Sequence, residues 1–232
     1  MTLNLAIVGY GKMGRLIEQL APEYDCAVRA KFNSCSNPRG TALSREALHG
    51  VDIGVEFSTP QAAPENIIRL ASAGVNVVAG TTGWLDHLPV VRDAVIQSGT
   101  ALVWAPNFSV GVNLFFQSVA HAAALFAKHQ EYESWGWEIH HAAKKDALSG
   151  TLQQLAAEMR GNGYTRVIPL SSNRAGAHPG THEIGFDSAT DTITLRHTAR
   201  EAFARGALRA ARWIAGKKGL FEFREILGDL TG

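Results

Sequence analysis

"LNLAIVGYGKMG", residues 3–14, joins an apolar run to three glycines, Gly9, Gly11 and Gly14, in GxGxxG spacing. The apolar run predicts a β-strand, and the helical spacing that continues through residues 14–22 predicts a helix directly after the turn. The first glycine allows the tight turn, the second lets backbone approach a pyrophosphate, and the third lets helix pack on strand. The stretch therefore predicts a dinucleotide-binding turn, although a plain strand–turn–helix would also use glycine.

The rest of the first hundred residues alternates short apolar runs with helical patterns. With residues 3–8, the predicted strands are 26–32, 51–57, 75–79 and 101–104. Between them, residues 65–74 and 85–99 place apolar side chains at helical spacing, and each segment stops at a glycine. Continuous apolar strands that alternate with helices indicate a parallel sheet covered on both faces. The fold class expected is α/β, with an N-terminal Rossmann-like, doubly wound parallel sheet.

The pattern changes after Asn107. A long apolar helix over 109–129 is followed by a Trp-rich strand over 134–141 and a helix over 151–160. Strand-like segments are then expected at 165–176, 181–188 and 191–199, before a closing helix at 201–216. We interpret this order as a dinucleotide-binding domain, 1–106 plus 207–232, with an α+β domain, 107–206, inserted before the last helix.

The composition excludes several classes of protein. The 232 residues carry a formal net charge of +1 and show no basic patch, so no nucleic-acid partner is expected. No apolar stretch reaches the roughly 18–20 residues needed to span a bilayer, so no membrane association is expected. Cys26 and Cys35 form neither a metal pattern nor a disulfide pattern. With no secretory leader visible, we expect a cytoplasmic protein without a metal.

Loops after the predicted strands indicate where a dinucleotide would lie. "EFSTP" (56–60), "GTTGW" (80–84) and "APNFSVGVN" (105–113) all fall at the carboxyl edge of the sheet, where open α/β folds bind ligands. The second strand ends with Lys31 and no carboxylate, and Lys31 with Lys12 could accept a 2′-phosphate. Lys31 could equally be a solvated strand end. NADPH is therefore favoured, and NADH stays open.

The segment "EIHHAAKKDALSGT", residues 138–151, gathers titratable and anion-binding groups. His140 and His141 lie on a predicted strand, so their side chains should point to opposite faces. Lys144 follows in the loop, and the triplet 149–151 opens a helix whose N–H groups and hydroxyls could bind a carboxylate. These groups suit a small anionic substrate that needs a proton. The alternative is a structural histidine, surface lysines and an ordinary N-cap.

Taken together, these segments resemble the 4-hydroxy-tetrahydrodipicolinate reductase (dihydrodipicolinate reductase) family nearly end to end. The resemblance covers the glycine turn, the three loops above, "RAGAHPGTHEIGF" and "HTAREAFARGALRAARWI". Its most specific element is 138–151, which is similar to the family signature E-x-H-H-x-x-K-x-D-A-P-S-G-T. One departure lies near the chemistry, because Leu148 stands where the signature has proline.

The resemblance implies a reaction and roles for residues. NAD(P)H would deliver hydride to an unsaturated six-membered ring with two carboxylates, and His140 would donate a proton with the help of Lys144. The implied substrate-binding residues are His141, Ser149, Gly150, Thr151 and Thr82. The expected cofactor-binding residues are Gly9, Gly11, Lys12, Met13, Gly14, Lys31, Phe57, Gly80, Thr81, Thr82, Ala105, Pro106, Asn107 and Phe108. The inserted domain would bind substrate and build a homotetramer.

Two other functions remain open at this point. The chain could be another Rossmann reductase of small anionic substrates, of the aspartate or homoserine dehydrogenase type. It could also be a non-catalytic NAD(P)-binding sensor, although a sensor would need neither the histidine pair nor Lys144.

Overall fold

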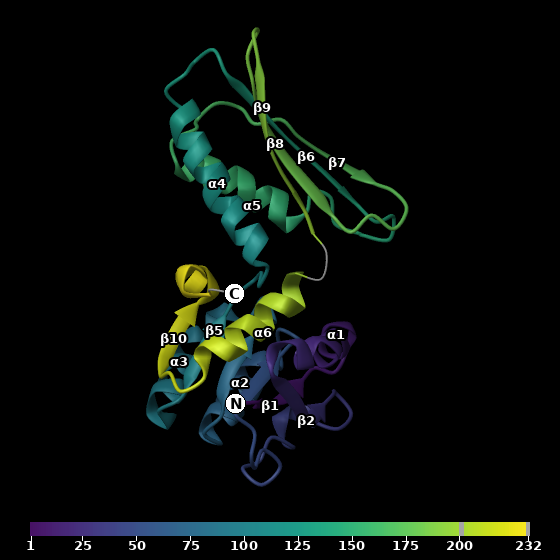
Figure 1. Cartoon of the computed structure of the whole chain (residues 1–232), viewed down its shortest axis with the longest axis vertical. Helices are drawn as coiled ribbons and strands as arrows, with labels where there is room; N and C mark the ends of the chain where they lie inside the picture. Colours follow the sequence, from purple (N-terminus) through teal and green to yellow (C-terminus); the bar gives the residue numbers. More distant parts are fainter. Residues whose placement is uncertain (200–201, 231–232) are drawn as a thin grey trace. The chain divides into compact units, whose positions relative to one another are not determined.

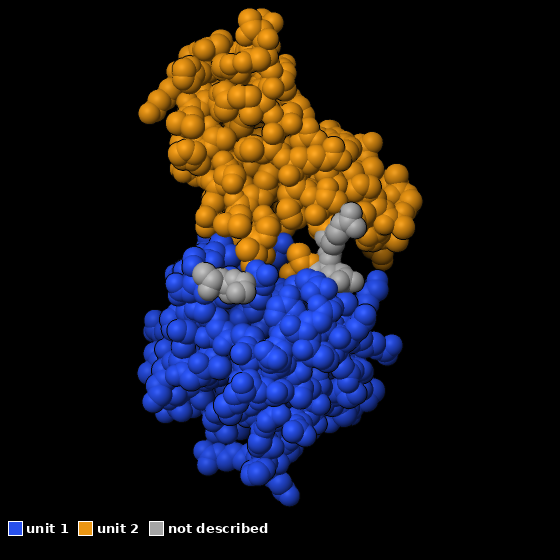
Figure 2. Space-filling view, viewed as in Figure 1, with its two compact units in different colours: residues 1–109, 203–232 blue, residues 110–202 orange. Residues whose placement is uncertain are grey.

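The computed structural model describes residues 1–199 and 202–230, and its contacts divide the chain into two units. Unit 1 comprises Met1–Ser109 and Phe203–Gly232, and unit 2 comprises Val110–Ala202; they are blue and orange in Figure 2. The sequence placed the boundaries after residues 106 and 206, whereas the contacts place them after residues 109 and 202.

Unit 1 is built on a parallel sheet of six strands (Figure 1). The strands are β1 (Leu3–Val8), β2 (Cys26–Phe32), β3 (Ile53–Glu56), β4 (Asn76–Ala79), β5 (Ala101–Trp104) and β10 (Gly219–Glu222). Their order is β10-β5-β4-β3-β1-β2, and every neighbouring pair is parallel. The chain leaves β1 toward β2 and then returns to the other side of β1 as β3. The switch point of the sheet therefore lies at β1 and β3, where ligands bind in such folds.

Helices cover both faces of this sheet. They are α1 (Lys12–Leu20), α2 (Ala63–Ser72), α3 (Leu88–Ser98) and α6 (Ala202–Ile214), with short 3₁₀ segments η1 (Ala21–Tyr24), η2 (Pro38–Gly40), η3 (Leu85–His87) and η4 (Phe223–Asp229). Ala6 and Val8 belong to the core that α2 and α3 complete. Ile7 points the other way and approaches α1 at Gly14. The prediction of a doubly wound, Rossmann-like domain is confirmed.

Three details of the predicted elements differ from the structure. Strands β3 and β4 begin at Ile53 and Asn76, later than the predicted 51 and 75. Strand β10 was missed, because four half-buried residues carry no periodicity and become a strand only through pairing with β5. The first residue of the predicted closing helix, Glu201, lies outside the described residues, and α6 ends at Ile214.

Unit 2 packs two helices on one face of a four-stranded sheet. Its elements are α4 (Val110–Phe126), β6 (Glu133–His140), α5 (Gly150–Gly161), β7 (Leu170–Arg174), β8 (Thr181–Asp187) and β9 (Thr192–Thr198). The strand order is β7-β6-β8-β9, with β6 and β7 parallel and the other pairs antiparallel. Apolar residues of α4, α5 and β8 form its core, including Phe115, Leu155 and Phe186. The predicted inserted α+β domain is confirmed, with β7 shorter than the predicted 165–176.

Within the described residues, the helices are too short or too polar to cross a bilayer.

Candidate active site

The glycine turn between β1 and α1 has the backbone that its sequence predicts. Gly9 has a φ of +97°, and a Cβ there would collide with the carbonyl of Phe57, which directly follows β3. A Cβ on Gly14 would lie 2.7 Å from the carbonyl oxygen of Gly9, so this glycine is needed for close packing. A Cβ on Gly11, the N-cap of α1, would meet nothing within 4 Å. Gly11 therefore borders open space beside a helix N-terminus, as a pyrophosphate requires.

A pocket of about 300 Å³ opens beside this turn, over the carboxyl ends of β1, β2 and β3. Three predicted cofactor residues, Gly9, Gly11 and Phe57, line it. The sequence analysis missed its other lining residues: Val8, Tyr10, Phe32, Asn33, Ser34, Asn37, Ser58, Thr59, Ala62 and Asn66. Their position after strands 1 to 3 was the available signal, because such loops form the binding crevice. We call this pocket the switch-point pocket.

Lys12, Met13 and Lys31 do not line the switch-point pocket. Lys12 is exposed, and Met13 is half-buried. The Lys31 ammonium lies 2.9 Å from Glu18 Oε1 and 4.9 Å from the ring centre of Tyr10. The hydroxyl of Tyr10 donates to the second oxygen of Glu18. Lys31 is an exposed residue near the end of β2, but it is not a free phosphate ligand, because a carboxylate of α1 balances its charge.

A buried carboxyl ties together the loops that surround the switch-point pocket. Glu56, fully buried at the end of β3, accepts hydrogen bonds from the amide and hydroxyl of Ser58 and from Asn66 Nδ2. The Ser58 amide also lies 2.8 Å from Thr81 Oγ1, which joins the loops after β3 and β4. Burial raises the pKa of Glu56, and its Oε2 has no partner among the described residues. Burial thus favours the neutral form of this carboxyl, and its hydrogen bonds hold the edge of the sheet.

The other predicted cofactor residues lie near the ends of β4 and β5. Thr81, Thr82, Ala105 and Pro106 line a small hollow of about 80 Å³. The remaining predicted residues support it from behind. A Cβ on Gly80 would collide with the ring of Phe57, Asn107 Oδ1 accepts from the amide of Ser109, and Phe108 is fully buried against Phe223. Thr81 and Thr82 can therefore contact a ligand directly, whereas the buried side chain of Phe108 cannot.

In unit 2, the two adjacent histidines differ in burial, but only His140 lies on strand β6, whereas the sequence placed both on the strand. The strand ends at His140, whose side chain is buried on the face that α4 and α5 cover, whereas His141 is exposed. Lys144, in the following loop, binds Asp146 through its ammonium at 2.7 Å. His140 and Lys144 thus lie in one segment, but the carboxylate near His140 is Glu138, whereas Lys144 pairs with Asp146.

The N-terminus of α5 is anchored to a buried carboxylate of β6. Ser149 caps the helix, since its Oγ accepts from the Leu152 amide at 3.2 Å. The Ser149 amide donates to Glu138 Oε1 at 2.9 Å, and its hydroxyl donates to Oε2. Arg174, the last residue of β7, donates to the same carboxylate at 2.9 Å and to the carbonyl of Asp146. Gly150 and Thr151 then begin α5, where backbone N–H groups lack helical partners.

A third histidine, His182 of β8, joins this cluster and was missed by the sequence analysis. It lies opposite Glu138 in the β6–β8 pair, and its Nε2 is 3.4 Å from Glu138 Oε2. Its ring centre is 5.0 Å from that of His140. Burial, with the nearby His140, lowers the pKa of His182 to about 4. Burial also lowers the pKa of His140, although Glu138 opposes this shift.

Glu138, His140 and His182 place ligand-type atoms within 4.8 Å of one another, so a metal ion must be considered. Both oxygens of Glu138 already accept hydrogen bonds, and the Arg174 guanidinium lies against one of them. A cation would have to displace these donors beside an existing positive charge. The cluster therefore fits bound protons better than a metal.

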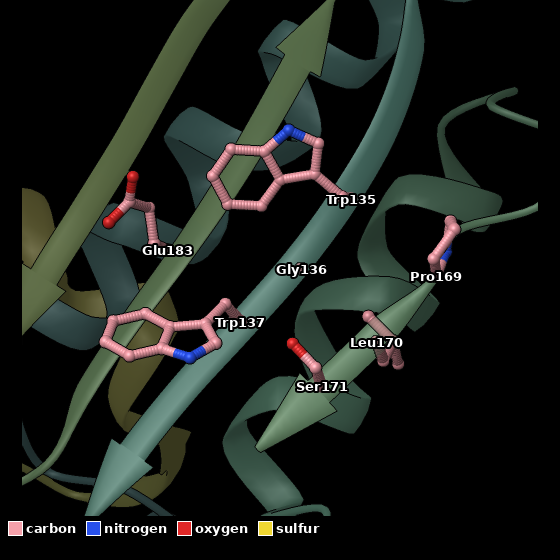
Figure 3. Close-up of a pocket in the computed structure, with 7 residues that line it drawn as sticks. All are labelled: Trp135, Gly136, Trp137, Pro169, Leu170, Ser171 and Glu183. Atoms are coloured by element: carbon pink, nitrogen blue, oxygen red, sulfur yellow. The ribbon is translucent and has the colours of Figure 1, made fainter. Parts of the chain in front are cut away.

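Unit 2 also carries a hollow of about 520 Å³ on the outer face of its sheet, away from the helices (Figure 3). Trp135, Trp137, Ser171 and Glu183 project from this face, as their register requires. A Cβ on Gly185 would collide with the Trp135 indole, so this glycine lets the indole lie flat on the sheet. A half-buried indole pair on an uncovered sheet face is typical of an interaction surface.

Comparison with known proteins gives matches across both units. Family models described as "Dihydrodipicolinate reductase, N-terminus" and "Dihydrodipicolinate reductase, C-terminus" match residues 3–108 and 111–227. The 4-hydroxy-tetrahydrodipicolinate reductase of Christiangramia forsetii is 33% identical, with 98% of this chain and 99% of that protein covered. The Thiobacillus denitrificans protein of the same name is also 33% identical over 98% of this chain and 99% of its own length.

Solved structures show the same fold. A dipicolinate-bound dihydrodipicolinate reductase from Paenisporosarcina sp. TG-14 superposes with a TM-score of 0.76 at 22% identity, covering 97% of this chain and 100% of that one. An amine dehydrogenase from Mycobacterium smegmatis gives a TM-score of 0.60 at 9% identity, covering 97% and 96%. Because the fold serves more than one named activity, the sequence matches carry more weight here than the superpositions.

Proposed function

The chain belongs to the dihydrodipicolinate reductase family and is therefore an oxidoreductase of lysine and diaminopimelate biosynthesis. We propose here how its residues reduce 4-hydroxy-tetrahydrodipicolinate to tetrahydrodipicolinate. The substrate and product names differ by one hydroxyl group. The balanced reaction therefore consumes NAD(P)H and one proton and releases NAD(P)⁺ and water.

One observation supports this proposal most directly. The signature segment 138–151, whose relatives carry the named activity, contributes His140, Glu138 and the Ser149 cap to a single buried cluster in unit 2. A purely structural segment would not need a buried carboxylate that accepts three hydrogen bonds beside a buried imidazole.

We assign the dinucleotide to unit 1. Backbone at Gly9, Gly11 and the start of α1 would bind the pyrophosphate, and the switch-point pocket would hold the adenosine side. Thr81, Thr82, Ala105 and Pro106 would contact the nicotinamide side. When bound, the nicotinamide supplies the hydride that reduces C4 of the ring. NADPH and NADH are both candidates. The Lys31 ammonium could bind the 2′-phosphate of NADPH, but it is already paired with the Glu18 carboxylate, which weakens that attraction.

We assign the dicarboxylate to the β6–α5 segment of unit 2. His141, the N–H groups of Gly150 and Thr151, and the Thr151 hydroxyl would bind its carboxylates. Lys144 would exchange its ion pair with Asp146 for one with the substrate. His140 would donate the proton that completes the reduction, a role that typically contributes about 10²–10⁴-fold to the rate. A dianion beside His140 would also raise its pKa and favour the protonated acid.

The outer face of the unit 2 sheet supports assembly with further copies of the chain, and we propose the family's homotetramer. We place the enzyme in the cytoplasm, which suits two cysteines that form no disulfide with each other.

A coupled assay tests the activity. The purified protein would receive 4-hydroxy-tetrahydrodipicolinate generated in place by its synthase, and oxidation of NADPH and NADH would be followed separately at 340 nm. Synthase-dependent oxidation that dipicolinate inhibits is the expected result. Oxidation at an equal rate without the synthase, or none with either cofactor, would contradict the proposal.

A further inference from the structure

Glu138 is a buried carboxylate that accepts three hydrogen bonds, and the proposed reaction gives it no role. It is completely buried, and Arg174, the Ser149 amide and the Ser149 hydroxyl all donate to its carboxylate. Although burial raises the pKa of Glu138, the hydrogen bonds from Ser149 and Arg174 outweigh it and hold the pKa below its usual value. Glu138 is therefore a buried negative charge at neutral pH.

This carboxylate faces one ring nitrogen of His140. Glu138 Oε2 lies 3.8 Å from His140 Nδ1, which is buried and has no hydrogen-bond partner among the described residues. The opposite edge of the ring lies against Gly180, where a Cβ would come within 3.1 Å of Nε2. The ring is thus confined between a carboxylate at Nδ1 and a position without a side chain at Nε2.

His182 holds the carboxylate from the other side. Its Nε2 lies 3.4 Å from Glu138 Oε2 and 3.2 Å from Ser149 Oγ, and only 4% of the residue is exposed. With its pKa lowered to about 4, the imidazole is neutral at neutral pH. A neutral donor can orient Glu138 and leave its negative charge in place. A lysine or arginine at this position would cancel that charge.

We propose that Glu138 is the counter-ion of His140 in its protonated form and that His182 is a positioning residue that holds Glu138 in place. The inference rests on the proposed role of His140 as proton donor. Glu138 stabilises the imidazolium at Nδ1, and His140 donates its proton to the substrate from Nε2, the edge that Gly180 leaves accessible.

Charges from every neighbouring element act on His140. Lys144 in the loop and Arg174 on β7 lower its pKa, whereas Glu138 on its own strand and Asp146 in the loop raise it. His182, on β8, is next to His197 of β9 and adds no charge while both are neutral. Glu138 is the largest of the influences that favour the protonated acid. Without Glu138, burial and the two cations would lower the pKa of His140 further.

The test compares Glu138→Gln, His182→Ala and His182→Gln with wild type. Glu138→Gln should lower the His140 pKa by about one unit, because an opposite charge within a few ångströms shifts a pKa by that much or more. Since an acid catalyst is active below its pKa, the fall in kcat with rising pH should move about one unit lower. At a pH above both midpoints, kcat should be about tenfold lower, with KM for substrate nearly unchanged.

The two His182 variants separate positioning from packing. His182→Ala should shift the kcat profile in the same direction, whereas His182→Gln, whose amide nitrogen can replace Nε2, should restore most of it. Glu133→Gln, an exposed carboxylate on the same strand, and exposed His129→Gln are the matched controls and should match wild type. Circular dichroism and thermal melts would identify misfolding, and the His182 pair still tests the proposal if Glu138→Gln does not fold.

A direct titration separates this inference from the proposed function. The His140 pKa can be measured by NMR of the ring protons in wild type, Glu138→Gln and His182→Ala, without any turnover. An unchanged His140 titration in both variants would overturn the proposal even if the enzyme is active. A fall in kcat that is equal at every pH, with a matching rise in KM, would also overturn it. If no turnover is found, the proposed function fails, yet the NMR titration still decides the counter-ion.

Discussion

At the scale of single residues, two adjacent histidines have different environments because the strand ends between them. His140 is 9% exposed and lies beside Glu138, whereas His141 is exposed beyond the strand end. A buried imidazole with a carboxylate neighbour is suited to proton transfer, and an exposed one is suited to binding an anion. The two histidines should therefore affect different kinetic constants.

We expect His140→Gln to lower kcat by about 10²-fold or more, because a general acid is lost, with little change in KM. His141→Gln should instead raise KM for the dicarboxylate about tenfold, the value of one charge-assisted hydrogen bond, because that contact is shared by ground and transition states. Steady-state kinetics with generated substrate would measure both. His129→Gln is the control, and calorimetry should show unchanged NAD(P)H affinity in all three. If His140→Gln keeps its kcat but loses the cofactor, the segment belongs to the cofactor site.

We expect the Lys31–Glu18 pair, rather than Lys31 alone, to set the preference between NADPH and NADH. Glu18→Gln should raise the ratio of kcat/KM for NADPH over NADH about threefold to tenfold, because it frees the Lys31 ammonium and removes a negative charge from its side. Lys31→Met should lower the same ratio. Glu23→Gln, an exposed carboxylate just beyond α1, is the control. Unchanged ratios in both test variants would mean that neither side chain approaches the adenosine ribose.

At the scale of elements, the β1–α1 unit shows how one turn divides its glycines between folding and binding. Gly9 and Gly14 are required by the chain itself, because a Cβ at either position would meet backbone. Gly11 is not required by the fold, because the space beside it is open. A ligand explains its presence better than packing does.

We expect Gly11→Ala to leave the free energy of unfolding within about 0.5 kcal/mol of wild type while weakening NAD(P)H binding at least about tenfold. Gly9→Ala should destabilise the protein by about 2–4 kcal/mol, through its positive φ and its collision with Phe57. Urea denaturation and calorimetric titration would measure the two effects. Gly163→Ala, at a φ of +89° with nothing near a Cβ, isolates the backbone strain. Normal cofactor affinity in Gly11→Ala would place the pyrophosphate elsewhere.

At the scale of the whole molecule, the chain forms two separate hydrophobic cores, because the sequence of unit 2 is inserted into that of unit 1. Residues 110–202 form their own sheet and helix layer, and unit 1 is completed only when the chain returns with α6 and β10. One face of the inserted sheet is covered by α4 and α5, and the indoles of Trp135 and Trp137 lie on the other face.

We expect Trp137→Glu to convert the proposed tetramer to smaller species, because a carboxylate would enter an apolar interface beside Glu183. Sedimentation velocity at several concentrations would measure the change. Ile96→Glu, on an exposed position of α3, is the matched control and should keep the wild-type mass. A wild-type mass for Trp137→Glu would remove the outer face from the assembly.

The sequence by itself determined what local interactions fix. The glycine turn, the apolar runs of β1, β2 and β5, and the Ser149 cap all depend on neighbours within a few residues, so their patterns could be read directly. The alternation of strands and helices then implied a parallel sheet, and the spacing of residues 138–151 identified His140, Lys144 and Ser149 as candidates.

Only the tertiary structure decided the partners that lie far apart along the chain. β10 became a strand through β5, Lys31 was bound by Glu18, and His182 reached Ser149 across 33 residues. Such contacts depend on sheet order and register, which bring together residues whose own neighbours carry no trace of the pairing. The charge that Glu138 presents to His140 is therefore a property of the folded unit, since the hydrogen bonds from Ser149 and Arg174 outweigh burial and keep that carboxylate ionised beside an imidazole.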